Sequence, residues 1–578
     1  MKKYLLLLLS LLFFQMGISQ NSNIIEPELQ QLLDKKGNDM ISINIILNSE
    51  INIKNLRNNV KDITDSKAFR QAIVGEFKSF TKQSQQEILS LLEAGKASGE
   101  IKDVVTHWLS NMITCTASKN YIYLLSSHPD IKILGYNETQ FLLWNEKGEE
   151  AVPHRGVAQH VRFVKADKAW NLGLTGKGVI VGVIDTGVNI HKDIEKNLWD
   201  GGEEYPNHGY NTFENSHDVS DGFSHGTHVA GIIAGDGTSG TQTGIAPDAT
   251  IMCIKVMDDG GSGNANTVCS GIEFAIEHGA DVLNMSLGFP LASSSTKEAL
   301  RQTYVNALEA NVAIITAVGN DGMLNMTYPV PNSVRVPGGC PPPRLHPDQQ
   351  VNPGGLSACI AVSAVDYQKR VAAFSSKGPV TWQTTSYEDY PYLPGKEIGL
   401  IRPDLCAPGV GIVSCNNNNS SGYVSMDGTS QATPCVAGIV CLMLQKKSYL
   451  TPAQICEALE TTAIKLSDTK SNETGSGLVD ALAVIEEIEN YEHIISVNEN
   501  IARNNVSIYP NPTNDNLHIE TEADIEEIII FDVYGRRQDV SYQSSAVNSI
   551  DVSKLNSGVY FINIKTANEN IVNRFIKK

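Results

Sequence analysis

The run Val179-Ile-Val-Gly-Val-Ile184 is apolar and mostly β-branched, and it ends directly at Asp185-Thr-Gly187. Four further apolar runs follow it along the chain, at 251–256, 282–285, 312–318 and 359–365. Short continuous runs of this kind are typical of strands buried on both faces of a parallel sheet. Helical patterns lie between them at Ser270–His278 and Thr296–Ala310. The sequence therefore predicts an α/β domain whose parallel sheet is sandwiched by helices.

The region before this domain has a different pattern. At about 150 residues per domain, the 578 residues suggest three or four domains. Region 20–144 alternates strand and helical patterns, which indicates a small α+β unit. Its expected elements are strands at Ile41–Leu47, Trp108–Ala117 and Ile131–Leu143, and helices at Ser66–Ala94 and Tyr121–Ser127. The charged, polar stretch from Trp144 to Arg155 is interpreted as an exposed linker and cleavage zone.

The sequence after Glu489 changes again, to short strand patterns separated by turn residues. The expected strands are 506–509, 517–520, 528–531 and 559–564. About 75 residues with this pattern predict a small all-β sandwich. The predicted boundaries are a signal peptide at 1–19, the α+β unit at 20–144, the α/β domain at 145–490, a linker at 491–505 and the sandwich at 506–578.

The first residues have the features of a secretory signal. Lys2 and Lys3 precede a run from Leu5 to Phe14 that is apolar apart from Ser10, and the small residues Gly17 and Ser19 follow. A run this short is typical of a signal peptide and not of a membrane-spanning helix. Cleavage is expected after Ser19, and the alternative is an uncleaved anchor. Since no other segment approaches 18 uninterrupted apolar residues, no membrane span is expected in the mature protein.

The amino-acid composition limits which classes of molecule the protein is expected to bind. The chain has 64 acidic and 45 basic residues, a formal charge of −19, and no run rich in Lys or Arg. A nucleic-acid partner is therefore not expected, because phosphate binding needs a basic patch. Ten cysteines in a chain of this length are too few for a disulfide scaffold. Cys340 and Cys359, which flank a loop rich in Pro and Gly, are the expected disulfide pair.

Three motifs carry side chains that together can perform acyl transfer. They are Asp185-Thr-Gly187, His225-Gly-Thr-His-Val-Ala-Gly231 and Gly428-Thr-Ser-Gln-Ala-Thr-Pro434. Each places one functional group at the end of a strand or the start of a helix, where ligands bind in open α/β sheets. Ser430 is a weak nucleophile that needs a base, His225 can take and return its proton, and a buried Asp185 orients the imidazole. Asn320, after the 312–318 run, can donate its amide to an oxyanion.

These motifs, in the chain order Asp, His, Ser, resemble those of the subtilisin-like serine peptidases, the subtilases. The resemblance covers about residues 156–488. It implies Asp185, His225 and Ser430 as a catalytic triad and Asn320 as the oxyanion donor. It also implies a substrate cleft whose walls are two glycine-containing segments, formed by Ser286, Leu287 and Gly288 on one side and by Gly261, Ser262 and Gly263 on the other. An extended substrate is expected to bind there as an added strand.

Both flanks resemble parts of exported peptidases. The α+β unit is similar to the propeptides of secreted subtilases, which act as folding chaperones and inhibitors and have the order β-α-β-β-α-β. The expected elements contain one strand fewer. The segment from Val506 to Lys578 resembles the C-terminal sorting domain of the type IX secretion system. This implies export through the periplasm and outer membrane, with release or surface attachment. The implied partners are protein or peptide substrates, the chain's own propeptide and the outer-membrane secretion machinery.

Several alternatives remain beside this interpretation. A non-catalytic binding or adhesion protein would usually have lost a triad residue. A narrow processing peptidase is suggested by the inserted loops Gly338–His346 and Ser386–Pro394. The pair His225 and His228 lacks the further ligands that zinc requires. No cofactor is expected for catalysis. A bound structural calcium ion is an open alternative. Its candidate ligands are His191, Asp193 and the segment 236–243.

Overall fold

The computed structural model describes residues 24–35, 37, 39–143, 148–152, 155–323, 327–341, 359–382, 399–491, 507–509, 513–520, 525–532, 537–538, 540–543, 548–566 and 570–577. The chain divides into two compact units, one up to His493 and one from Ile494 onward. The expected signal peptide and nearly all of the expected linker 491–505 lie outside the described residues. So do the expected loop Ser386–Pro394 and residues 342–346 of the other loop.

The larger unit is built on a seven-stranded sheet in which each pair of neighbours is parallel. Its order is β16-β15-β14-β13-β8-β11-β9. The strands are β8 (Ile180–Asp185), β9 (Gly209–Asn211), β11 (Thr250–Lys255), β13 (Val282–Met285), β14 (Ala313–Ala317), β15 (Ile360–Val365) and β16 (Leu405–Pro408). All five predicted runs form strands of this sheet, and the predicted fold class is confirmed.

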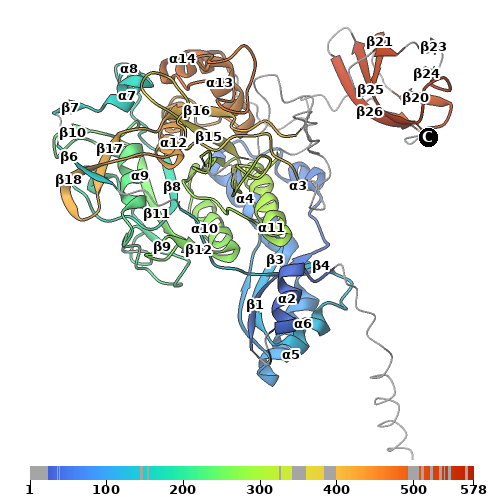
Figure 1. Ribbon diagram of the computed structural model, residues 1–578, viewed down its shortest axis with the longest axis horizontal. Helices are drawn as coiled ribbons and strands as arrows, with labels where there is room; N and C mark the ends of the chain where they lie inside the picture. The colour runs from blue at the N-terminus through green and yellow to red at the C-terminus, as the bar shows by residue number, and fades with distance from the viewer. Residues whose placement is uncertain are drawn as a thin grey trace, which may run out of the picture. The chain divides into compact units, whose positions relative to one another are not determined.

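Helices cover both faces of this sheet (Figure 1). One face carries α7 (Gln159–Phe163), α8 (Ala166–Trp170), α9 (His225–Ala234), α12 (Thr429–Lys446), α13 (Pro452–Thr462) and α14 (Ala481–Glu487). The other face carries α10 (Ala265–Glu277) and α11 (Ser294–Glu309). Along β11, Ile251 and Cys253 belong to the first core and Met252 and Ile254 to the second. Because side chains alternate along a strand, burial on both faces requires the continuous apolar runs seen in the sequence.

Residues 24–143, here called the N-terminal unit, form a four-stranded antiparallel sheet with helices. The sheet order is β2-β3-β1-β4. The elements are α2 (Pro27–Lys35), β1 (Ile41–Leu47), α3 (Ile53–Val60), α4 (Ser66–Ser84), α5 (Gln86–Ser98), β2 (Ile101–Thr106), β3 (Met112–Ala117), α6 (Lys119–Leu125) and β4 (Ile131–Tyr136). Apart from the additional helices, these follow the β-α-β-β-α-β order of the propeptides, with one strand more than the sequence predicted.

Two expected elements of the N-terminal unit were wrong in detail, and one strand was missed. The helix at 66–94 is two helices, with Gln85 between them. The expected strand Ile131–Leu143 ends at Tyr136, and a separate short strand, β5 (Gln140–Phe141), follows. Strand β2 was missed because it lies at the edge of the sheet. Four of its six residues are exposed and one is fully buried, so no alternating apolar pattern marks it.

Three small sheets lie beside the main one. Strands β17 (Ile412–Asn416), β18 (Asn419–Met426) and β6 (Glu149–Ala151) form an antiparallel sheet with β18 in the middle. Strand β7 (Gly156–Val157) pairs with β10 (Thr241–Gln242). Strand β12 (Ser262–Gly263) pairs with β5 of the N-terminal unit. The first and last of these sheets join segments on either side of residues 144–147 to the α/β domain.

The C-terminal unit is strand-rich, as expected. Its two four-stranded sheets have the orders β19-β20-β24-β23 and β22-β21-β25-β26. The strands are β19 (Ser507–Tyr509), β20 (Asn516–Glu520), β21 (Ile525–Asp532), β22 (Arg537–Gln538), β23 (Ser541–Gln543), β24 (Asn548–Asp551), β25 (Gly558–Thr566) and β26 (Asn570–Lys577). Leu517 and Ile550 of the first sheet share one core with Ile530 and Ile562 of the second, which is the arrangement of a sandwich.

The expected disulfide between Cys340 and Cys359 is not present. All ten cysteines are free and buried. The Cys359 thiol donates to the Pro337 carbonyl, with 3.0 Å between sulfur and oxygen. Burial raises the pKa of the Cys359 thiol to about 12, so both sulfurs serve as small apolar groups of the core.

Candidate active site

Asp185 ends β8, near the middle of the main sheet, and its side chain is fully buried. Its Oδ1 accepts hydrogen bonds from His225 Nδ1 and from the Thr186 main-chain N–H, both at 2.8 Å. A donor at Nδ1 fixes the imidazole tautomer in which Nε2 carries the lone pair. The pair therefore has the geometry of a base and its orienting carboxylate.

A second buried carboxylate, Asp221, holds the loop that presents His225. One of its oxygens accepts from the Thr186 hydroxyl at 2.8 Å and from two main-chain N–H groups before α9. The other accepts from the Thr227 N–H at 2.9 Å and hydroxyl at 2.7 Å. Asp221 thus ties the end of β8 to the start of α9. This role was not predicted from the sequence, where the available signal was an acidic residue four positions before His225.

Ser430 is the second residue of α12, which packs against α9. Its hydroxyl donates to the Ser286 carbonyl at 3.2 Å, and the Ser286 hydroxyl donates to the Ser430 carbonyl at 2.8 Å. The position at a helix N-terminus favours negative charge near the serine. The fold thus brings the predicted nucleophile to the start of a helix next to the one that begins with His225.

Asn320 follows β14 and is oriented by the residue before Ser430. The Asn320 side-chain carbonyl accepts from the Thr429 N–H and from the Thr429 hydroxyl, both at 2.9 Å. The amide nitrogen therefore lies on the opposite side of the carboxamide group. This contact couples the predicted oxyanion donor directly to the N-terminus of α12.

The two predicted cleft walls lie on either side of a segment of the same chain, residues 140–143. In the antiparallel pairing of β5 with β12, Phe141 lies opposite Ser262 and Gln140 opposite Gly263. The Leu142 N–H donates to the Gly261 carbonyl and the Gly288 N–H donates to the Leu142 carbonyl, both at 3.0 Å. Leu142 and Leu143 are fully buried, in the same apolar core as Leu287. The cleft thus holds residues 140–143 in an extended conformation.

Arg335 contacts both a cleft wall and the strand held between the walls. Its guanidinium binds Asp321 through two hydrogen bonds of 2.6 and 2.9 Å, and both side chains are buried. It also donates to the carbonyls of Leu143 at 3.3 Å and Gly288 at 3.4 Å. Asp321 is next to Asn320 in the sequence. Arg335 was missed because no recognisable motif surrounds it.

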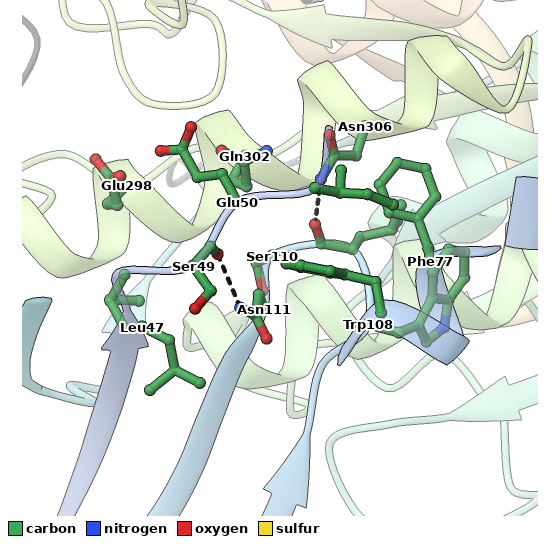
Figure 2. A pocket seen from close by; sticks show the side chains of 14 residues that line it. Leu47, Ser49, Glu50, Phe77, Trp108, Ser110, Asn111, Glu298, Gln302 and Asn306 are labelled. Carbon is green, nitrogen blue, oxygen red and sulfur yellow. Dashed lines mark hydrogen bonds between the residues drawn. The ribbon is translucent and has the colours of Figure 1, made fainter. Parts of the chain in front are cut away.

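The N-terminal unit makes a broad contact with α10 and α11. Figure 2 shows part of this contact, where Asn306 of α11 donates to the Leu109 carbonyl at 2.5 Å and Asn111 donates to the Ser49 carbonyl at 2.9 Å. The pocket drawn there has a volume of about 20 Å³, which is room for one water molecule. It is therefore a packing gap between the two parts and not a ligand site.

The second histidine of the His motif has a structural environment. His228 is buried, and its Nε2 donates to the carbonyls of Ile412 and Val424, both at 3.1 Å. Burial, with a smaller contribution from His225, lowers the pKa of His228 to about 3. The ring is thus a neutral donor that joins α9 to β17 and β18, and it does not form a metal pair with His225.

The predicted calcium ligands are bonded to protein groups. The two Asp193 oxygens accept from the Ser239 N–H and the Tyr423 hydroxyl, each at 2.6 Å. His191 accepts from the Asp193 N–H through Nδ1 and donates to the Gly422 carbonyl through Nε2. Calcium requires six or more oxygen ligands, so this donor set does not fit the ion. A structural calcium elsewhere stays a prediction, tested by thermal unfolding with and without a chelator.

Comparison with known proteins assigns the chain to a family. Residues 176–478 match the subtilase family. The chain is 33% identical to subtilisin DY from Bacillus licheniformis over 56% of its own length and 96% of that protein. It is 33% identical to subtilisin Savinase from Lederbergia lenta (55% and 95%) and 32% identical to M-protease from Shouchella clausii (58% and 72%). The chain belongs to the subtilase family, and it is a serine endopeptidase.

The C-terminal unit has its own match. Residues 507–578 match the secretion system C-terminal sorting domain, which identifies the tail as a sorting signal of the type IX pathway. The protein is therefore exported, and it is secreted or attached to the cell surface. Among the described residues, no helix combines the length and apolar composition needed to cross a membrane.

Proposed function

We propose that Asp185, His225 and Ser430 form a catalytic triad that hydrolyses peptide bonds through an acyl-enzyme. The Ser430 hydroxyl turns from the Ser286 carbonyl to His225, which takes its proton as the oxygen attacks the peptide carbonyl. His225 then protonates the leaving amine, and water releases the acyl group by the reverse sequence. The observation that carries this proposal is the 2.8 Å hydrogen bond between His225 Nδ1 and buried Asp185.

The oxyanion is assigned to Asn320 and to the main-chain N–H of Ser430. Both groups lie at the N-terminus of α12, and Thr429 orients the carboxamide. Donors that are fixed before the reaction stabilise charge without reorganisation. Substrates are proposed to bind as an added strand between Gly261–Gly263 and Ser286–Gly288, because residues 140–143 bind there in this way.

We also propose that the N-terminal unit is a propeptide that the enzyme removes itself. Its segment 140–143 fills the cleft, and Gly148 lies close to Met426, four residues before Ser430. The bond to be cut therefore belongs to the segment between Leu143 and Gly148. Four ion pairs support a specific contact in which the N-terminal unit acts as an inhibitor of the α/β domain. In each pair the N-terminal unit supplies the positively charged side chain: Arg57–Glu309, Arg70–Asp281, Lys78–Glu277 and Lys132–Glu298.

Intact mass tests both proposals on the full chain, wild type beside Ser430→Ala. We expect the wild type to separate into two fragments cut between residues 143 and 148, and the variant to stay joined there. A fluorophosphonate probe should label the matured wild type at Ser430. If the matured protein neither reacts with the probe nor cleaves an unfolded protein, the triad assignment is wrong. Cleavage of the Ser430→Ala chain at the same bond would remove self-processing alone.

A further inference from the structure

Three side chains that can bind a metal ion meet in the interior of the α/β domain. They are His191 and Asp193, in the loop after β8, and Cys415 of β17, and all three are buried. A ring nitrogen, a carboxylate oxygen and the sulfur lie within 4.8 Å of one another. These three residues, here called the buried ligand cluster, do not belong to the candidate active site.

The charge of Asp193 requires a positive partner. Its side chain is fully buried, yet no Lys or Arg of the described residues forms an ion pair with it, whereas the neighbouring Asp236 is paired with Lys196 at 3.1 Å. Buried charges are normally paired or bound to a metal ion. The hydrogen bonds from Ser239 and Tyr423 go to different carboxylate oxygens and leave a further lone pair on each. Asp193 can therefore coordinate a cation without losing these bonds.

His191 has the orientation of a metal ligand. Its Nε2 donates to the Gly422 carbonyl at 2.9 Å, and Nδ1 accepts from the Asp193 N–H at the longer distance of 3.2 Å. A histidine that binds a metal through one ring nitrogen usually donates its other N–H to a carbonyl or carboxylate in this way. Burial lowers the pKa of His191, so the ring is neutral, as a metal ligand has to be.

Cys415 determines which kind of ion fits. Burial, with smaller contributions from Asp193 and Asp236, raises the pKa of the Cys415 thiol well above its usual range. The sulfur therefore keeps its proton until a metal ion displaces it. Zinc binds thiolate, imidazole and carboxylate together, whereas calcium and magnesium take oxygen ligands. With Zn²⁺, the thiolate and the carboxylate balance the charge of the ion.

The buried ligand cluster lies against the helix that begins with His225. Cys415 packs on Gly231 of α9, where an added Cβ would be 2.6 Å from the sulfur. The Ser414 hydroxyl donates to the carbonyl of His228, in the same helix, at 2.7 Å. Figure 1 shows β17 beside α9. An ion in the cluster would thus join β17 to the loop after β8 and support α9.

We propose that the buried ligand cluster binds one Zn²⁺ ion as a structural site. The ligands are Nδ1 of His191, one carboxylate oxygen of Asp193 and the thiolate of Cys415. Binding transfers one proton from the Cys415 thiol to the solvent. Three protein ligands leave one tetrahedral position for a water molecule. The proposal does not depend on the triad assignment, because the cluster contains none of the triad residues.

Zinc binding tests the proposal on the full chain with Ser430→Ala, which prevents self-digestion. The protein is treated with a chelator, and Zn²⁺ binding is measured by calorimetry in buffers with different ionisation enthalpies. We expect one ion per chain, about one proton released, and a higher midpoint of urea unfolding. Cys415→Ser should weaken binding by at least about 100-fold, since loss of even an outer partner of a ligand costs 10- to 100-fold. The matched control is Cys441→Ser, whose buried thiol donates to the Ala437 carbonyl.

Co²⁺ gives a second readout, because a thiolate ligand adds a charge-transfer band in the near ultraviolet. The parent and Cys441→Ser should show this band, and Cys415→Ser should not. Millimolar Ca²⁺ should leave the band unchanged, and displacement of Co²⁺ by Ca²⁺ would overturn the proposal. If Cys415→Ser does not fold, His191→Gln replaces it, and the same loss of zinc affinity is expected.

Two further results would overturn the proposal. One is a parent chain that binds no Zn²⁺ at micromolar concentration. The other is zinc binding that Cys415→Ser leaves unchanged and that His128→Gln removes. That result would place the ion on the second group of metal-binding side chains among the described residues, which is more exposed: Glu87, His128 and Asp130.

Discussion

The hydroxyls of Ser286 and Ser430 each donate to the carbonyl of the other residue, at 2.8 and 3.2 Å. Pro434 explains why the Ser430 carbonyl accepts a hydrogen bond from Ser286. It lies in the second turn of α12. Since proline has no N–H, it cannot donate to the carbonyl four residues earlier, which is that of Ser430. Ser286 supplies the missing donor from the cleft wall.

The first prediction is that Ser286 and Pro434 are energetically coupled. Ser286→Ala should leave the buried Ser430 carbonyl without its donor and lower the free energy of unfolding by about 1–3 kcal/mol. In a Pro434→Ala background the helix regains an N–H, so the same change should cost less. Urea unfolding of the four proteins, each carrying Ser430→Ala to prevent self-digestion, measures the coupling. Equal costs in both backgrounds would show that the Ser286 hydroxyl does not replace the helix bond.

The sequence predicted those parts of the fold that carry a strong periodic signal. Strands β8, β11, β13, β14 and β15 are buried on both faces, so their apolar runs are continuous and easy to recognise. Edge strand β2 and the three-residue strand β6 have mostly exposed side chains. Their position depends on main-chain pairing with distant segments, which leaves no local pattern.

The same distinction applies to the candidate site. Asp185, His225, Asn320 and Ser430 stand in short motifs at the ends of elements, so the sequence identified them together. Asp221 and Arg335 act through contacts with residues that are distant in the sequence. Their roles depend on burial and on which hydrogen bonds they accept or donate, and neither property can be read from the sequence alone.

The second prediction concerns the oxyanion donor. Asn320→Ala should lower kcat by about 10²- to 10³-fold, the range measured for loss of such a donor in a subtilisin. KM should change little, because the donor acts on charge that develops in the transition state. Thr429→Val is the companion variant: it removes one of the two donors that orient the carboxamide and should give a smaller loss of kcat. A rise in KM with unchanged kcat for Asn320→Ala would contradict the oxyanion role.

The third prediction separates the structural role of Arg335 from its contact with the bound strand. Arg335→Met leaves Asp321 as a buried charge without this partner and should cost about 3–5 kcal/mol of stability. Arg335→Met/Asp321→Asn should recover more than half of that loss. The double variant should still have a KM raised by about tenfold for extended peptides, because the guanidinium bond to the bound carbonyl is lost. Recovery of both stability and KM would limit Arg335 to a structural role.

The fourth prediction is that two buried histidines reduce stability in acid. Burial lowers the pKa of His160 to about 4 and that of His228 to about 3. The unfolded chain binds their protons near pH 6.5. The stability from the two neutral rings is thus complete above pH 6.5. Below that pH it is lost as the pH falls toward 4 and 3, by about 1.4 kcal/mol per pH unit for each ring.

His160→Gln and His228→Gln test this in the Ser430→Ala background. Glutamine can keep a donor toward the Thr243 carbonyl, or toward those of Ile412 and Val424, without taking up a proton. Urea unfolding between pH 6.5 and 4 should show a shallower loss of stability for each variant, by about 1.4 kcal/mol per pH unit. Carboxylates that titrate in this range affect parent and variant equally, and the exposed His217→Gln is the matched control. A slope equal to that of the parent would mean that the ring already takes up its proton in the folded protein.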